Sequence, residues 1–189
     1  MPTKKAQLKT PKTSLYFGLM FTLACSASTD DSNDSSSPPE STEYYEVTGE
    51  GLWEGSYPFE SHMLARRILQ PNTSTIFEQF IGLGEETAES YELIADVDLE
   101  NSTFTFTYDD GSYEGTGVLI GDAWDWHAWE STSFATDGTS VVSQDTKDEN
   151  GIIATKIGYD ADGQEQWTME EVLTPITEEE WQALQDGVE

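Results

Sequence analysis

The residues of this chain that could take part in catalysis or metal binding are few. His127 lies two residues after Asp125, so a strand would place both side chains on one face, as a hydrolase or a metal site could use. A serine hydrolase also needs a nucleophile in a turn such as Gly-x-Ser-x-Gly, which this sequence lacks. Zinc needs three or four protein ligands, and His62 and His127 are the only histidines. We therefore expect no enzyme, no catalytic residue, no metal and no cofactor.

Aromatic side chains offer a different chemistry, because rings can line a site for an apolar small molecule. The candidate ligand-binding rings are Trp53, Tyr57, Tyr91, Phe104, Phe106, Trp124, Trp126 and Trp167. The alternative is that the same rings fill the protein interior and leave no space for a ligand.

Arg66 and Arg67 are the only arginines, and in a strand one of two adjacent residues points inward. We include Arg67 among the candidate ligand-binding residues, because an inward guanidinium could hold a carboxylate or phosphate group. The alternative is an internal ion pair with one of the many acids.

The elements that would position these residues are strands. In residues 124–129 a two-residue alternation predicts that Trp124, Trp126 and Ala128 share one face and that Asp125, His127 and Trp129 share the other. Similar runs, separated by Gly, Asn and Asp turns, predict strands at 51–59, 64–69, 75–83, 90–99, 103–108, 113–120, 123–134, 139–146, 152–159 and 165–173. The fold class is therefore all-β, an up-and-down antiparallel meander of about ten strands closed into a barrel.

One short helix is predicted at the C-terminal end. Thr177 followed by Glu180 is a capping box, and Gly187 ends the helix. Trp181 and Leu184 lie on one side, which should pack against the barrel wall or an open end.

Charge divides the chain into two parts. Its formal net charge is -29, yet four lysines lie in the first dozen residues and no acid precedes Asp30. The rest of the chain is strongly acidic, which excludes nucleic-acid binding. We expect a monomer.

The N-terminal segment, residues 1–24, has a lysine-rich start and an apolar run that is too short to span a membrane, as in a signal peptide. It ends in Thr22-Leu23-Ala24-Cys25, which resembles the lipobox of bacterial lipoproteins. The resemblance implies lipidation of Cys25, a membrane anchor and residence in the cell envelope, at the outer membrane if the source is Gram-negative. An ordinary signal peptide that contains Cys25 is the alternative. Residues 25–43 are predicted to be a disordered acidic tether of Ser and Pro, and residues 44–189 to be the barrel domain.

A second resemblance lies at the predicted first strand. Gly51-Leu52-Trp53 is similar to the Gly-x-Trp of the calycins, the lipocalins and fatty-acid-binding proteins, and Gly51-x-Trp53-x-Gly55 before Tyr57-Pro58 resembles the opening of nitrobindin-type barrels. Nitrobindins bind haem through a late histidine, and this chain has none after His127. The resemblance implies a barrel that binds a small hydrophobic molecule such as a lipid or fatty acid. The alternative is a structural or protein-interaction lipoprotein with a filled barrel.

Overall fold

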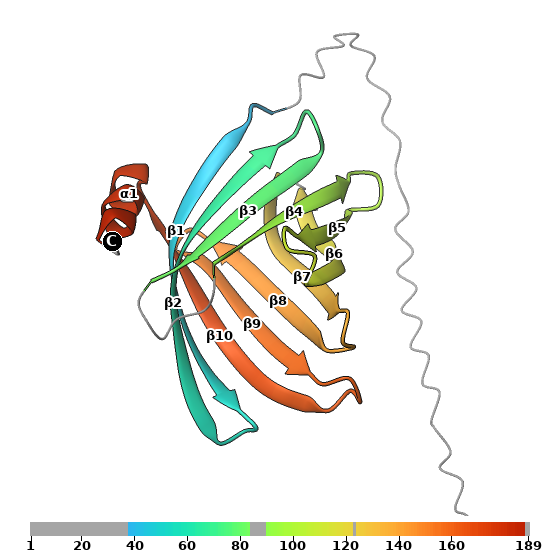
Figure 1. Ribbon diagram of the computed structural model, residues 1–189. Helices are drawn as coiled ribbons and strands as arrows, with labels where there is room; N and C mark the ends of the chain where they lie inside the picture. The colour runs from blue at the N-terminus through green and yellow to red at the C-terminus, as the bar shows by residue number, and fades with distance from the viewer. Residues whose placement is uncertain (1–37, 84–89, 123, 188–189) are drawn as a thin grey trace, which may run out of the picture. The chain divides into compact units, whose positions relative to one another are not determined.

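Buried and exposed side chains alternate along ten strands in the computed structural model, which describes residues 38–83, 90–122 and 124–187 (Figure 1). The strands are β1 (Ser41–Trp53), β2 (Tyr57–Gln70), β3 (Thr75–Gly82), β4 (Tyr91–Asp98), β5 (Thr103–Tyr108), β6 (Tyr113–Asp122), β7 (Asp125–Ala135), β8 (Ser140–Asp148), β9 (Gly151–Tyr159) and β10 (Glu165–Ile176). One helix follows, α1 (Glu178–Asp186).

Every strand pairs with its chain neighbours in antiparallel fashion, and β10 pairs with β1 to close the barrel. The closing ladder runs from Tyr44 opposite Ile176 to Trp53 opposite Trp167. Closure leaves no unpaired sheet edge. The predicted fold class, a closed all-β meander with a short C-terminal helix, is confirmed.

The first two predicted strands are wrong in their bounds. The prediction placed one strand over 51–59, whereas Trp53 and Tyr57 face each other across a hairpin turn. Glu54 and Gly55 have φ of 48° and 65°, which is a turn conformation rather than an extended one. The strand before this turn starts at Ser41, inside the segment predicted as tether.

The tryptophan-rich stretch differs from its predicted alternation. Ile120 pairs with Ala128 but Gly121 pairs with Trp126, so His127 is an extra residue in a β-bulge. Gly121 has φ of 116°, a value that non-glycine residues rarely adopt. The bulge turns both Trp126 and Trp129 inward, where their rings stack with centroids 5.0 Å apart. The two rings were predicted on opposite faces because the sequence gives no sign of one additional residue.

Packing in the interior is concentrated at one end of the barrel. Near the β2–β3, β4–β5 and β8–β9 turns, Leu69, Ile76, Val97 and Ile152 join Trp126 in a fully buried core. None of these five side chains borders the cavity described below. One end of the barrel is therefore filled.

The helix α1 lies outside the barrel wall (Figure 1). Its capping box forms as predicted, since Thr177 Oγ1 accepts a hydrogen bond from the Glu180 backbone N–H and the Glu180 carboxylate accepts one from the Thr177 backbone N–H. Trp181 is buried against Leu64 and Leu83, which confirms packing against the wall. Arg66 extends on this outer side, 5.8 Å from the Trp181 ring centroid.

The predicted signal segment, Cys25 and most of the predicted tether lie outside the described residues. Within the described ranges no helix is long and apolar enough to cross a membrane.

Candidate functional site

The other end of the barrel is hollow. A cavity of about 730 Å³ lies inside it, and both a ring of strands and their turns contribute to its wall. Trp53, Glu60 and Asp110 line it and are exposed, which places the mouth at the end of the β1–β2 and β5–β6 hairpins. The barrel is thus neither filled throughout nor empty throughout.

Aromatic rings form one wall of the cavity. Phe80 stacks on Tyr91 with centroids 4.7 Å apart, Tyr91 on Tyr108 at 5.0 Å, and Tyr108 contacts Tyr113 at 5.5 Å. These rings come from β3, β4, β5 and β6, so the row crosses four neighbouring strands. Burial raises the pKa of Tyr91 and of Tyr108, so both hydroxyls remain protonated and can donate hydrogen bonds at neutral pH.

Inward glycines make room for this wall. A Cβ at Gly117 would overlap the Phe104 ring on the neighbouring strand, because that ring lies flat over the glycine. The ring therefore occupies the space that a side chain would take.

Arg67 points inward and Arg66 outward, which settles the choice left open above. The Arg67 side chain forms a buried ion pair with Glu78 on the adjacent strand. Its guanidinium also lies over the rings of Trp126 and Trp129, 5.1 and 5.0 Å from their centroids. The internal ion pair that we kept as the alternative is thus the contact observed. Arg67 lies in the floor of the cavity with its charge already balanced by Glu78.

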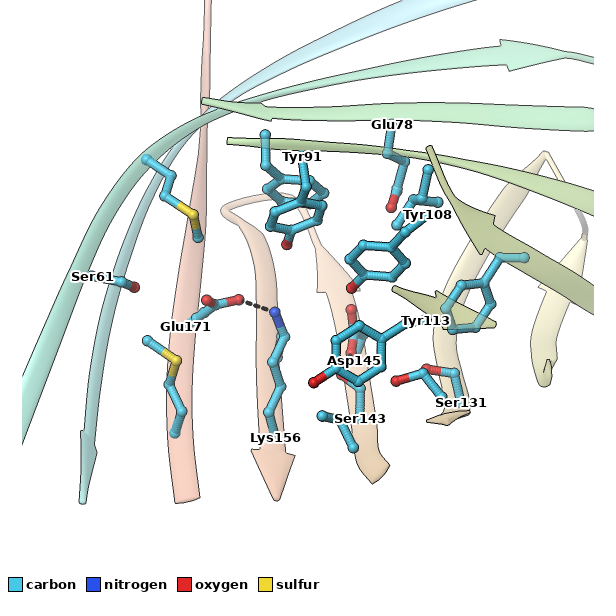
Figure 2. Close-up of a pocket in the computed structure, with 18 of the residues that line it drawn as sticks. Ser61, Glu78, Tyr91, Tyr108, Tyr113, Ser131, Ser143, Asp145, Lys156 and Glu171 are labelled. Atoms are coloured by element: carbon cyan, nitrogen blue, oxygen red, sulfur yellow. Dashed lines mark hydrogen bonds and ion pairs between the residues drawn. The ribbon is translucent and has the colours of Figure 1, made fainter. Parts of the chain in front are cut away.

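A second ion pair lies in the cavity wall, between the partly exposed Lys156 and the buried Glu171. Lys156 Nζ is 2.5 Å from Glu171 Oε2, and the glutamate side chain is almost fully enclosed. Burial opposes the charge on Lys156, but Tyr91 and the Glu171 carboxylate outweigh it and raise the lysine pKa. The ammonium group of Lys156 therefore stays charged and forms an ion pair with Glu171 (Figure 2).

Asp145 is the third buried carboxylate of the cavity wall. It is only 7% exposed, and it accepts a 2.5 Å hydrogen bond from the Ser143 hydroxyl. Burial raises the pKa of Asp145 to about 6, against the opposing effects of Ser143, Lys156 and Arg67. No ion pair joins this carboxylate to a basic side chain in the part of the chain that the structure describes.

The structure brings six of the nine predicted ligand-binding residues to the cavity, namely Trp53, Arg67, Tyr91, Phe104, Phe106 and Trp167. Tyr57 does not line it, because it sits at the tip of the β1–β2 hairpin and is 64% exposed. Trp126 is buried in the filled end, beneath Arg67. Trp124 precedes β7 and packs against the core without reaching the cavity.

Apart from Arg67, the charged residues of the wall were missed, although the alternation contained a signal for two of them. Glu78 falls between Ile76 and Phe80 on the inward face of β3. Glu171 shares the inward face of β10 with the apolar residues Met169 and Leu173. An acid at an inward position of an apolar face is unusual and marks a site or an ion pair.

His127 and Asp125 do not form a site. Both side chains are exposed, and His127 is the extra residue of the bulge. His62 lies elsewhere on the barrel and contacts Glu46 at 2.8 Å. Across residues 38–83, 90–122 and 124–187 no cluster of three His, Cys, Asp or Glu side chains could hold a metal ion.

No protein-family model matches the sequence, and no curated protein matches it.

Proposed function

We propose that the protein is a lipid-anchored envelope protein whose calycin-like barrel binds a small, largely apolar molecule without changing it chemically. The cavity carries this proposal. Its volume of about 730 Å³ is in the range of pockets that enclose small organic ligands. Its wall combines stacked rings, which can cover an apolar body, with serine hydroxyls and charged side chains, which can orient one.

The wall also supports binding over catalysis. Among the described residues that border the cavity there is no histidine and no cysteine. The ionisable groups Arg67, Glu78, Lys156 and Glu171 are engaged in ion pairs. Asp145 accepts a hydrogen bond from the Ser143 hydroxyl, and no histidine among the described wall residues joins this pair into a triad. These groups can orient a ligand, and none is arranged with a partner to attack one.

Binding can be tested with Nile red, a neutral fluorophore that brightens in apolar surroundings. Ser131 borders the cavity, whereas its neighbour Thr132 on β7 does not. We expect the unaltered chain to bind the dye, Ser131→Trp to lose about tenfold or more in affinity by filling the space, and Thr132→Trp to bind as before. Equal binding by both variants would place the dye outside the cavity, and near-ultraviolet circular dichroism checks that each variant is folded.

Anchoring needs its own experiment, since Cys25 lies outside the described residues. The support for it is the lipobox resemblance at Thr22-Leu23-Ala24-Cys25. We expect the chain expressed in a bacterium to incorporate an alkyne-tagged fatty acid and to sediment with membranes. Cys25→Ala should abolish both results, whereas Ser26→Ala should change neither. A soluble, unlabelled product from the unaltered gene would exclude the anchor and leave the cavity proposal intact.

A further inference from the structure

The buried charges of the cavity wall do not balance. Arg67 is paired with Glu78, and Lys156 with Glu171, so both basic groups are neutralised by a carboxylate of their own. Asp145 is the carboxylate left over, with the Ser143 hydroxyl as its hydrogen-bond donor. An enclosed carboxylate without a cation is costly, because burial removes its hydration.

Nearby charges do not supply the missing cation. The charged groups that act on Asp145 are Lys156 on β9, Arg67 on β2 and Glu78 on β3, and Glu171 on β10 lines the same cavity. Lys156 and Arg67 favour the ionised form of Asp145, but each is paired with its own carboxylate and neither forms an ion pair with Asp145 in the part of the chain that the structure describes. The mouth adds Glu60 and Asp110, which makes five carboxylates against two basic groups along the whole cavity.

The space in front of Asp145 is lined by tyrosines. Figure 2 shows the hydroxyls of Tyr91 and Tyr108 turned toward the central space that Asp145 and Lys156 also face. Tyr91, Tyr108 and Tyr113 belong to one row of rings in contact. Ring faces and hydroxyl oxygens both attract a positive group, the first through the quadrupole and the second through lone pairs.

We infer that the cavity takes an organic cation, an amine or ammonium group on an apolar body, with the positive group held by Asp145 beside the tyrosine row. This inference deepens the proposed small-molecule binding and depends on it. The rings would cover the apolar body, and the acidic mouth would attract a cation and repel a fatty acid. Arg67 is a weaker receptor for an anion, because its Nε is paired with Glu78 and its guanidinium lies over the rings of Trp126 and Trp129, which leaves Nη1 as a buried donor without a hydrogen-bond partner among the described residues.

Three soluble probes with one apolar body test the inference. These are 4-phenylbutylamine, 4-phenylbutanol and 5-phenylvalerate, which share the phenylbutyl body and differ in carrying a cationic, a neutral or an anionic head. Their binding is measured by isothermal titration calorimetry at about pH 7.5, where Asp145 is ionised. We expect the amine to bind about tenfold or more tightly than the alcohol, and the carboxylate to bind most weakly.

Asp145→Asn keeps the shape of the side chain and removes its charge. This variant should lower the affinity for the amine to that of the alcohol, without weakening the alcohol. Asp96→Asn is the matched control, because Asp96 is exposed on β4 and does not border the cavity. It should leave the preference for the amine unchanged.

The remaining outcomes separate the two proposals. If the alcohol binds as tightly as the amine, the inference fails and small-molecule binding stands. If the amine is preferred equally by Asp145→Asn, the charge of Asp145 is not its receptor and the inference is overturned. If no probe binds and Nile red does not bind either, both proposals fail.

Discussion

Replacing Asp145 by asparagine should make the unliganded protein more stable at neutral pH. The carboxylate is 7% exposed and its pKa is raised from an ordinary value of 3.8 to about 6, chiefly by burial. A difference of roughly two pKa units corresponds to about 3 kcal/mol of unfavourable free energy in the ionised native state. Asparagine can still accept the hydrogen bond from Ser143, but its amide must also be buried, so we expect a net gain of about 1–2 kcal/mol.

The pH dependence follows from proton binding. Between about pH 4 and pH 6 the native state holds the proton on Asp145 while the unfolded chain releases it, so this residue lowers stability as the pH rises through that interval. Below about pH 4 both states are protonated and the variant has no advantage. Above about pH 6.5 both are ionised and the advantage is constant.

Urea denaturation followed by tryptophan fluorescence, from pH 4 to pH 8, measures the difference between the two proteins. Other carboxylates, such as Glu43 with its pKa lowered by Lys147 against burial, titrate in both proteins and cancel in the difference. Asp96→Asn should show no pH-dependent gain. Two results would refute the reasoning. One is a difference in the free energy of unfolding between Asp145→Asn and the unaltered chain that does not change from pH 4 to pH 8. The other is an Asp145→Asn protein that is less stable than the unaltered chain at pH 7.

Three further substitutions test two contacts of the cavity wall and the cap of α1 by the same denaturation assay. Glu78→Gln leaves Arg67 buried without its partner and should destabilise the protein by about 3–5 kcal/mol, more than replacing both residues together by Leu and Met. Gly117→Ala brings a methyl group against the Phe104 ring and should cost about 1–3 kcal/mol, with a change in near-ultraviolet circular dichroism. Thr177→Ala removes the helix cap and should cost about 1 kcal/mol.

Matched controls for these substitutions lie on exposed positions. Glu114→Gln on β6, Thr116→Ala beside Gly117 and Glu179→Ala in α1 should each change stability by less than about 0.5 kcal/mol. A Glu78→Gln protein as stable as Glu114→Gln would show that the Arg67 pair contributes little. For Gly117 and Thr177, a loss no larger than that of the control would contradict the ring contact or the cap.

The strand order could be predicted because hairpins joined by Gly, Asn and Asp turns leave few alternatives. Asp160-Ala161-Asp162-Gly163 illustrates this, since Gly163 has φ of 76° in the turn before β10. The turn at Glu54 and Gly55 was missed because the apolar alternation of Trp53, Tyr57 and Phe59 continues across it in sequence. Alternation alone cannot show that a chain reverses between two rings.

The aromatic residues of the site could be predicted from the sequence, whereas its charged residues other than Arg67 could not. Phe104 and Phe106 alternate with threonines, so their inward direction followed from the period of a strand. Asp145 and Lys156 belong to strands with mixed polar sequences, and only the register between β8 and β9 shows that they face the same interior. Trp126 and Trp129 could not be placed together, since a bulge changes the parity of every residue after it.

One end of the barrel is packed and the other is hollow, so one end stabilises the fold while the other is free to bind a ligand. Leu69, Ile76 and Ile152 lie at the end of the barrel away from the mouth, and they pack in the core without bordering the cavity. Substitutions at Ser131, Tyr113 or Trp167 would alter the cavity without changing the packed end. The residues that border the cavity can therefore vary in evolution or design, and change the ligand that is bound, while the residues of the packed end stay the same.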